Sequence, residues 1–295
     1  MTLYIIANPY AGNGRAKTVV KEVERIWTFS QVVPFYTQKN GDEKKQVQKL
    51  EKMFRLKEDY LLVLGGDGTL SKVLSCLARD IPFAYYPLGS GNDFARVLPN
   101  YGLKDLLAAM QKRASIELFL YAYEGGIILN SLDTGFAAWV IQSAEHSKLK
   151  KTLKRWGLGS LAYIFYGVLG IFLAPTADLY LENQAGQKKS LSQLFFFSLA
   201  NNRYFGGGIM IWPQASAFKE GLDMVYGQKL GILKRINFLL ALLLRKHRKR
   251  QFIRHEEVER LVLEVDESCL VQVDGEMVAE RYFELVRESR QIYLP

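Results

Sequence analysis

Three glycine-rich segments contain the residue types that a phosphate-binding site requires. They are Asn8-Pro9-Tyr10-Ala11-Gly12-Asn13-Gly14-Arg15, Leu64-Gly65-Gly66-Asp67-Gly68-Thr69 and Pro87-Leu88-Gly89-Ser90-Gly91-Asn92-Asp93-Phe94-Ala95-Arg96. Glycine lets the backbone approach a phosphate closely and turn its N–H groups toward the oxygens. Three such segments in one chain are hard to explain by packing alone, and they predict a nucleotide-phosphate site.

Charged side chains in these segments indicate how the phosphate would be held. Asp67 and Asp93 would repel a phosphate unless a divalent cation, usually Mg²⁺, lies between the carboxylate and phosphate oxygens. Thr69 can cap the helix that follows it, and Arg96 can clamp a phosphate from one turn beyond Asp93. For 64–69 taken alone, the alternative is a tight strand-to-helix turn with an Asp cap.

A further pair of carboxylates, Asp274 and Glu276, lies near the C-terminus. Asp274-Gly275 falls between two strand patterns, which is the commonest signature of a tight hairpin turn. From the residues alone the turn is the favoured interpretation. A turn can also present a carboxylate into a cleft, so a catalytic role is compatible with it.

The elements that must position these residues alternate between strand and helix over the first hundred residues. Strand patterns cover 3–7, 32–37, 60–64 and 83–87, and helix patterns cover 15–27, 42–56 and 69–79. This alternation predicts a doubly wound α/β domain with a mostly parallel sheet. The glycine-rich segments follow three of its strands, at the carboxyl edge where such sheets bind ligands.

Strand patterns predominate from residue 116 onward. Those at 116–123 and 127–132 flank a hairpin signal, and others cover 179–182, 194–200, 222–226, 261–265, 270–273 and 282–286. Helix patterns near 157–173 and 231–250 interrupt them. We expect a larger, β-rich, antiparallel and sandwich-like second domain at 116–282, after an α/β domain at 1–115.

Length and composition agree with two packed domains. The chain has 295 residues, 49% of them apolar and 23% charged, whereas single cores usually stop growing at about 250–300 residues. Two cysteines, Cys76 and Cys269, are too few for a disulfide framework or a structural zinc site. They are expected to be small core residues in a reducing compartment.

The net charge of +9 is concentrated in two basic runs, at 148–155 and 245–254, that contain no acidic residue. Ten of their basic residues are Lys148, Lys150, Lys151, Lys154, Arg155, Arg245, Lys246, Arg248, Lys249 and Arg250. Such runs suit an anionic membrane surface or an anionic polymer. The alternative is a solvated surface that keeps the protein soluble.

An uncharged run from 157 to 177 follows the first basic run. Its length approaches the roughly 20 apolar residues of a membrane span, but several glycines and Pro175 interrupt it. We therefore expect a buried or interfacial helix. The N-terminus enters a strand pattern without a basic leader, which predicts no export signal. The expected location is the cytoplasm, peripheral at the inner face of the membrane.

Several nucleotide-binding motifs are missing from the sequence. It contains no G-x-x-x-x-G-K-[ST], and the third position of a Rossmann fingerprint that begins at Gly12 is Lys17. Neither His-Arg-Asp nor Asp-Phe-Gly occurs. The sequence is therefore not that of a P-loop NTPase or a protein kinase, and it disfavours dinucleotide oxidoreduction.

Taken together, the motifs resemble the diacylglycerol kinase catalytic family, which includes bacterial soluble lipid kinases and the sphingosine and ceramide kinases. The resemblance is carried by the three glycine-rich segments, by Asn130 with Gly135, and by Val273-Asp274-Gly275-Glu276. It extends over essentially the whole chain. It implies a nucleotide-binding α/β domain, a lipid-binding β-rich domain, catalysis in the cleft between them, and a C-terminal strand at about 283–295 that returns to the first domain.

The resemblance also implies roles for individual residues. Asp274 would be the base that accepts the proton of the lipid hydroxyl, and Glu276 would support it or the metal. Asp67, Asp93 and Glu117 would bind Mg²⁺. The residues around ATP would be Asn8, Pro9, Gly12, Gly14, Arg15, Gly65, Gly66, Asp67, Gly68, Thr69, Gly89, Ser90, Gly91, Asn92 and Arg96.

The sequence departs from the family pattern at a few positions. Ser90 replaces the commoner threonine, Glu117 replaces an aspartate, and the chain is aromatic near Tyr166, where a relative has lysine. The segment Pro213-Gln214-Ala215 to Glu220-Gly221 has altered spacing and Glu for Asp, which weighs against a structural Mg²⁺ site there.

The resemblance implies an ATP-dependent lipid kinase, with diacylglycerol converted to phosphatidic acid as the leading reaction. One alternative acceptor is a sphingoid base or another lipid alcohol; NAD is disfavoured because Gly91-Asn92-Asp93-Phe94 has the lipid-kinase form. The other alternative is a catalytically silent protein that binds a membrane or nucleic acid through the basic runs, against which the intact acidic residues argue. We expect a membrane-lipid partner and no nucleic acid, and a homodimer is left open.

Overall fold

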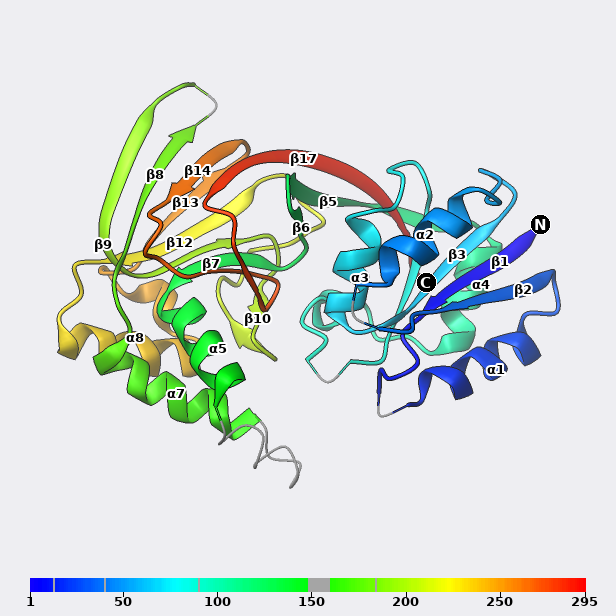
Figure 1. Cartoon of the computed structure of the whole chain (residues 1–295), viewed down its shortest axis with the longest axis horizontal. Coiled ribbons are helices and arrows are strands. Elements are labelled where there is room, and N and C mark those ends of the chain that lie inside the picture. Colours follow the sequence, from blue (N-terminus) through cyan, green and yellow to red (C-terminus); the bar gives the residue numbers. More distant parts are fainter. Residues whose placement is uncertain (13, 40, 90, 148–159, 184) are drawn as a thin grey trace.

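The computed structural model describes residues 1–12, 14–39, 41–89, 91–147, 160–183 and 185–295. Within these ranges the chain builds two domains that lie side by side and are joined by a pair of long strands (Figure 1). Ser90 and the basic run 148–155 fall outside the described residues.

The first domain alternates strands with helices, as predicted. Its elements are β1 (Thr2–Ala7), α1 (Ala16–Ile26), β2 (Gln31–Tyr36), α2 (Glu43–Glu51), β3 (Tyr60–Gly65), α3 (Asp67–Leu74), β4 (Ala84–Pro87), the 3-10 helix η1 (Ala95–Val97) and α4 (Leu103–Gln111). The strands pair in parallel in the order β2-β1-β3-β4. The predicted doubly wound α/β fold is therefore confirmed.

The alternation of side chains along β1 explains why helices cover both faces of this sheet. Successive strand residues point to opposite faces. Ile6 packs in a core with α2 and α3, whereas Ile5 packs in a second core with α1 and α4. Because both faces are covered, β1 and β3 are almost wholly apolar and buried.

Two long antiparallel strands, β5 (Ser115–Tyr123) and β17 (Tyr282–Tyr293), connect the domains. Figure 1 shows β17 in red, arching from the second domain to the first. One end of β17 pairs with β14 (Leu261–Val265), and near its other end Ile292 forms a bridge with Phe83, just before β4. The C-terminal strand thus returns to the first domain.

The second domain is antiparallel. Its strands are β6 (Gly126–Ile128), β7 (Ser131–Gly135), β8 (Ala177–Asn183), β9 (Lys188–Ala200), β10 (Tyr204–Phe205), β11 (Ile209–Met210), β12 (Leu222–Gln228), β13 (Arg254–Val258), β14, β15 (Val271–Val273) and β16 (Glu276–Val278). Apart from the hairpin of β10 and β11, they join β5 and β17 in one curled sheet around a core that includes Leu179, Phe197 and Leu263. The β-rich prediction is confirmed.

Three helices, α5 (Phe136–His146), α7 (Ser160–Leu173) and α8 (Ile232–Leu243), lie together on one side of this sheet (Figure 1). Phe136 of α5, Phe196 of β9 and Phe238 of α8 share a core there. No helix in the described ranges combines the length and the apolar character that crossing a membrane demands.

The strand expected at 127–132 is wrong in one respect, because the structure divides it into β6 and β7. The backbone N–H groups of Leu129 and Asn130, at the break, donate to the carboxylate of Asp274 instead of to a neighbouring strand. A side chain distant in the sequence therefore interrupts the strand.

Candidate active site

The carboxyl ends of β3 and β4 bring two glycine-rich segments into contact. Gly66 lies at the N-terminus of α3 in an extended conformation. A Cβ on Gly89 would lie 2.7 Å from the Cα of Gly66 and 2.6 Å from Asn92 Oδ1. A Cβ on Gly65 would lie 2.5 Å from the Cβ of Thr69. These close approaches require glycine.

The segment after β1 lies at the same edge of the sheet. Asn8 Nδ2 donates to Thr69 Oγ1 at 3.4 Å. Gly12 has a φ of +59°, and a Cβ there would lie 2.9 Å from the carbonyl oxygen of Leu88. The three glycine-rich segments thus gather at one edge, as the strand order requires.

The carboxylate of Asp67 lies where these segments meet. Its Oδ2 accepts a hydrogen bond from the backbone N–H of Asp93 at 2.5 Å, and Tyr85 Oη donates to its Oδ1 at 3.4 Å. Burial raises the pKa of Asp67 to about 7, and the negative charges of Asp93 and Asp274 add to the rise, although backbone N–H donors oppose it. A bound cation would favour the ionised form.

Asp93 extends the site toward the second domain. Its Oδ2 accepts from the backbone N–H of Gly207 at 2.8 Å, and its carbonyl oxygen accepts from Asn202 Nδ2 at 3.0 Å. Burial raises the pKa of the Asp93 carboxyl. Its Oδ1 is buried and accepts no hydrogen bond from the described residues, with Arg96 Nε 3.6 Å away. A buried oxygen with an open coordination position, near a second carboxylate, fits the hard oxygen ligands that Mg²⁺ prefers.

Asp274 lies in the two-residue turn between β15 and β16, where Val273 pairs with Glu276. Asp274 and Gly275 have φ values of +52° and +87°. Positive φ at both central residues matches the tight hairpin turn that Asp-Gly favours. The predicted turn is therefore present, and it directs the Asp274 side chain toward β6, β7 and α3.

Four donors surround the Asp274 carboxylate. The backbone N–H groups of Asn130 and Ser131 donate to Oδ1 at 2.6 and 3.2 Å. Ser71 Oγ and the backbone N–H of Leu129 donate to Oδ2 at 2.9 and 3.0 Å. Burial raises the pKa of Asp274 to about 6, while these donors oppose the rise by stabilising the carboxylate. Asp274 is thus fixed in position and mostly ionised at neutral pH.

Contacts across the domain boundary place Asp274 beside the glycine-rich segments of the first domain. Ser71 belongs to α3 of the first domain, and its neighbour Lys72 forms an ion pair with Glu276 at 2.5 Å. A Cβ on Gly68 would lie 3.6 Å from Glu276 Oε1, and a Cβ on Gly91 would lie 3.8 Å from the Cα of Gly207. Asp67, Asp93 and Asp274 therefore lie close together where the two domains meet, and we call this junction the crevice.

A further buried acid, Asp133, supports the Asp274 turn through hydrogen bonds with neighbouring residues. Its Oδ2 accepts from Ser131 Oγ at 2.7 Å and from the side-chain amide of Gln272. The Oε1 of Gln272 in turn accepts from the backbone N–H of Gly275 at 2.6 Å. Asp133 thus connects residues on both sides of Asp274, and burial raises its pKa to about 7.

Some of the residues predicted for the site lie at its margin or outside it. Gly14 and Arg15 are exposed and Pro9 is half-buried; Arg15 Nε donates to the carbonyl oxygen of Gly12, at 3.3 Å. Glu117 is not brought to Asp67 and Asp93: it is exposed on β5, and its carboxylate accepts a hydrogen bond from Ser289. Its neighbour Leu118 takes the inward position, so Glu117 faces outward.

The structure also shows site residues that sequence reasoning missed. Asn202 Nδ2 donates to Asn130 Oδ1 at 2.8 Å as well as to Asp93, so it links both domains. A signal for it existed: Asn201-Asn202 follows a strand pattern and precedes Gly206-Gly207-Gly208. Ser71 had no signal, because a serine on a helix is ordinary.

A separate cluster of ionisable groups lies at β12 and β13. Among the described residues, Asp223, His255 and Glu257 alone form a group of three such side chains whose ligand atoms lie within 4.8 Å of one another. The ammonium of Lys219 lies 3.0 Å from Asp223 Oδ2 and 3.2 Å from Glu257 Oε1. The protein thus supplies a cation of its own there, near the segment whose departures weighed against structural Mg²⁺.

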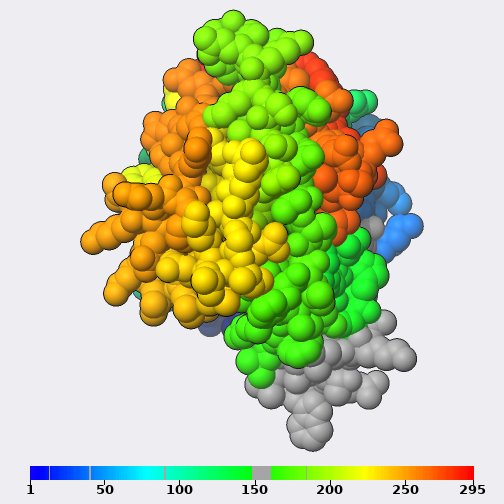
Figure 2. Space-filling view, turned by 90° about the vertical axis from the view of Figure 1, so that its left-hand side faces the viewer, coloured from blue at the N-terminus to red at the C-terminus, as the bar shows by residue number. Residues whose placement is uncertain are grey.

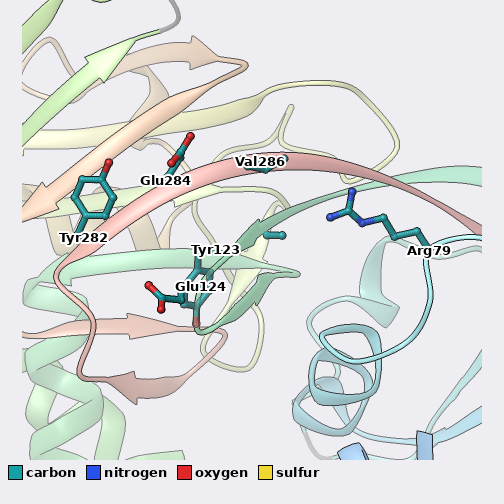
Figure 3. Close-up of a pocket in the computed structure, with 7 residues that line it drawn as sticks. Arg79, Tyr123, Glu124, Tyr282, Glu284 and Val286 are labelled. Carbon is teal, nitrogen blue, oxygen red and sulfur yellow. The ribbon is translucent and has the colours of Figure 1, made fainter. Parts of the chain in front are cut away.

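A cavity of about 300 Å³ lies beside the strands that join the domains. Figure 3 shows Tyr282, Glu284 and Val286 along β17, with Tyr123 and Glu124 below them and Arg79 on the first domain. The lining contains none of the three aspartates of the crevice. This cavity is therefore distinct from the candidate active site.

Comparisons with known families cover nearly the whole chain. Residues 2–118 match the diacylglycerol kinase catalytic domain, and residues 130–285 match the YegS C-terminal NAD kinase beta sandwich-like domain. A diacylglycerol kinase from Staphylococcus carnosus (strain TM300) is 25% identical over 304 residues, which cover 99% of this chain and 94% of that protein.

Solved structures share the two-domain fold. A crystal structure of a diacylglycerol kinase from Bacillus anthracis str. Sterne matches with a TM-score of 0.71 and 21% identity, over 100% of this chain and 97% of that one. An NAD kinase from Archaeoglobus fulgidus, solved in complex with ATP, matches with a TM-score of 0.52 and 13% identity, over 99% and 93%. The agreement of both domain matches with the fold and with the motifs at the crevice shows that this chain belongs to the diacylglycerol kinase and YegS-like family of lipid kinases.

Proposed function

We propose that the protein transfers the γ-phosphoryl group of ATP to the hydroxyl of a membrane lipid, with diacylglycerol as the substrate and phosphatidic acid as the product. The observation that carries the proposal is the convergence of Asp67 and Asp93, on the glycine-rich edge of one domain, with Asp274 on the other. Phosphoryl transfer needs groups for positioning, charge neutralisation and proton acceptance, and the crevice contains all three.

The glycine-rich segments would hold the triphosphate. Gly66 and Gly89 bring two backbone turns into contact at the N-terminus of α3, where N–H groups and the helix dipole attract anions. Arg96, exposed at the rim beside Gly207, could reach a phosphate oxygen.

Asp67 and Asp93 would hold Mg²⁺, which when bound neutralises the negative charge of the β- and γ-phosphate oxygens. Asp93 Oδ1 is the oxygen best placed to bind the ion, because it is buried and accepts no hydrogen bond from the described chain. Burial raises the pKa of Asp67 to about 7, and the nearby charges of Asp93 and Asp274 add a repulsion that a bound cation would relieve.

Asp274 would act as the base, although its two oxygens already accept four hydrogen bonds. Three of the donors are backbone N–H groups, which cannot easily leave. The fourth, the Ser71 hydroxyl, comes from the opposite domain and can be exchanged. The lipid hydroxyl would take its place at Oδ2, give its proton to Asp274 and attack the γ-phosphorus, while the bond to the bridging oxygen breaks and ADP leaves.

The proposal is tested by incubating the protein with γ-labelled ATP, Mg²⁺ and a panel of lipids in detergent micelles. The panel contains a diacylglycerol, a monoacylglycerol, a sphingoid base and an isoprenoid alcohol, with NAD as a soluble acceptor. We expect label in the phosphatidic acid fraction, and roughly 10²–10⁴-fold slower labelling when Asp274→Asn replaces the wild type. Label in another lipid product would reassign the acceptor. Absence of transfer to every acceptor would contradict the proposed activity.

A further inference from the structure

Helix α7 presents a continuous apolar stripe to solvent. The exposed residues are Leu161, Ile164, Phe165, Val168, Phe172 and Leu173; 161, 164 or 165, 168 and 172 recur at intervals of three or four positions. The opposite side of the helix is packed: a Cβ on Gly170 would lie 2.8 Å from the Phe136 ring of α5. Large apolar side chains in such numbers on one exposed face indicate an interaction surface.

Helix α8 presents a second stripe of the same kind. Its exposed residues are Ile232, Leu233, Leu240, Leu243 and, just beyond its end, Leu244; Leu233 is 78% exposed. Its other side carries Phe238, Ala241 and Leu242 into the core. Both helices are therefore amphipathic with an exposed apolar face, the reverse of what a solvated surface helix shows.

The two helices form one surface. They pack against each other, and Arg235 Nη1 of α8 donates to the carbonyl oxygen of Ile171 in α7 at 3.3 Å. Figure 2 shows α7 in green and α8 in yellow side by side on one face of the second domain. We call the two exposed stripes the α7–α8 face.

The chain around this face is strongly basic. From residue 224 to residue 255 there are nine basic residues and no acidic one. Five of them, Arg245, Lys246, Arg248, Lys249 and Arg250, follow directly after Leu244 and are exposed. Apolar side chains flanked by exposed Lys and Arg are the pattern of helices that lie in the interface of an anionic bilayer.

We propose that the α7–α8 face inserts into the interfacial layer of an anionic lipid bilayer, with residues 245–250 against the headgroups. A second copy of this chain is the other candidate for covering the face. A two-fold symmetric interface places the same patch on both subunits, so the basic residues around the face would meet each other and repel. Charge complementarity therefore favours the bilayer.

The inference goes beyond the proposed reaction, because docking requires neither ATP nor a lipid acceptor. The face contains none of the residues assigned to the crevice. If vesicle binding fails while transfer to lipid in detergent micelles persists, the docking proposal alone is contradicted. If vesicle binding persists without any transfer, the proposed reaction alone is contradicted.

The test measures sedimentation with sucrose-loaded vesicles of phosphatidylcholine, with or without phosphatidylglycerol, in the absence of nucleotide and diacylglycerol. We expect wild-type protein to bind the anionic vesicles, and salt to weaken binding. Leu233→Ser with Leu240→Ser should lower the partition coefficient at least about tenfold, since these leucines would leave the apolar layer. The matched control is Met53→Ser with Leu56→Ser, two exposed apolar residues of the first domain, which should bind like wild type.

A second variant separates charge from apolar contact. Lys249→Gln with Arg250→Gln should lower binding to anionic vesicles roughly 25-fold, at about fivefold per basic side chain, and leave binding to neutral vesicles unchanged. All variants should keep the wild-type circular dichroism spectrum. Wild-type binding by the leucine variant would overturn the proposal. The proposal would also be overturned if analytical ultracentrifugation showed that the wild type is a dimer and the leucine variant a monomer.

Discussion

At the scale of single residues, the site depends on buried carboxylates. Burial and the neighbouring negative charges both disfavour their ionised forms. Asp67 is enclosed beside Asp93 and Asp274, and its pKa is raised to about 7. Without a cation, a site with this much negative charge resists full ionisation. Metal binding should therefore be sensitive to loss of either first-domain carboxylate.

The first prediction concerns Asp67→Asn. We expect the Mg²⁺ concentration for half-maximal activity to rise by more than the roughly tenfold that loss of an outer-shell partner costs. The measurement is a Mg²⁺ titration of phosphoryl transfer. The control is Asp105→Asn, because the Asp105 carboxylate caps α4 by accepting from the backbone N–H of Gly102. An unchanged titration for Asp67→Asn would exclude Asp67 as a ligand.

The second prediction is a pH dependence set by Asp274. Its folded pKa is raised to about 6, and its active form is the carboxylate. Activity should therefore be full above pH 7 and fall as the pH drops through about 6, toward a tenfold loss per pH unit below it. The rate is measured at saturating Mg²⁺, which keeps Asp67 ionised. A rate that stays level down to pH 5 would argue against a base with this pKa.

The sequence predicted these residues unevenly, for physical reasons. Asp67 and Asp93 follow strands and precede helical turns, so their placement depends on local structure that the sequence encodes. Ser71 acts through a contact between the domains, which no local pattern reveals. Asn202 also links the domains, and the glycine run that follows it was the one local signal for it. Glu117 was predicted to bind the metal but lies outside the site. The alternation of side chains along the strand, which buries Leu118 and Leu120, already directs Glu117 outward.

At the scale of elements, the site depends on how closely the turns after β3 and β4 approach each other. Gly66 and Gly89 touch through their backbones, so a side chain at either would separate the turns. The separation would displace the backbone N–H groups that are proposed to bind the phosphates, while the sheet beneath would be unaffected.

The third prediction is therefore that Gly89→Ala raises the KM for ATP roughly tenfold or more, because a Cβ would lie 2.6 Å from Asn92 Oδ1 and 2.7 Å from Gly66. The melting temperature should fall by only a few degrees. Gly231→Ala is the control, since a Cβ there meets nothing within 4 Å. An unaltered KM for Gly89→Ala would mean that these turns do not contact the nucleotide.

Element boundaries show where long-range contacts override local pattern. The helix expected at 69–79 ends at Leu74. Arg290 of β17 donates to the carbonyl oxygens of Leu74 and Leu77, and thereby satisfies groups that a continuing helix would have used. This capping residue lies more than two hundred positions away, so a local reading could not find it. The strands of the first domain, by contrast, were predicted to within about two residues. For β1 and β3 the reason is burial on both faces, which makes them almost wholly apolar.

At the scale of the whole molecule, the proposed reaction depends on two domains that meet at their polar edges. Ser71 and Lys72 of α3 reach Asp274 and Glu276 of the second domain. A lipid hydroxyl can reach Asp274 only if the Ser71 contact is exchanged, which implies that the crevice opens to admit the lipid. The α7–α8 face lies on the same domain as Asp274. Docking at a bilayer would therefore hold the proposed base at the membrane that contains its lipid substrate.

The most direct test compares ATP binding with phosphoryl transfer in Asp274→Asn. The asparagine keeps the size of the side chain and lies on the opposite side of the crevice from the glycine-rich turns. We predict wild-type affinity for Mg²⁺ and ATP by calorimetry, with transfer to diacylglycerol slowed by roughly 10²–10⁴-fold. Transfer at close to the wild-type rate, or loss of ATP binding equal to the loss of rate, would contradict the account.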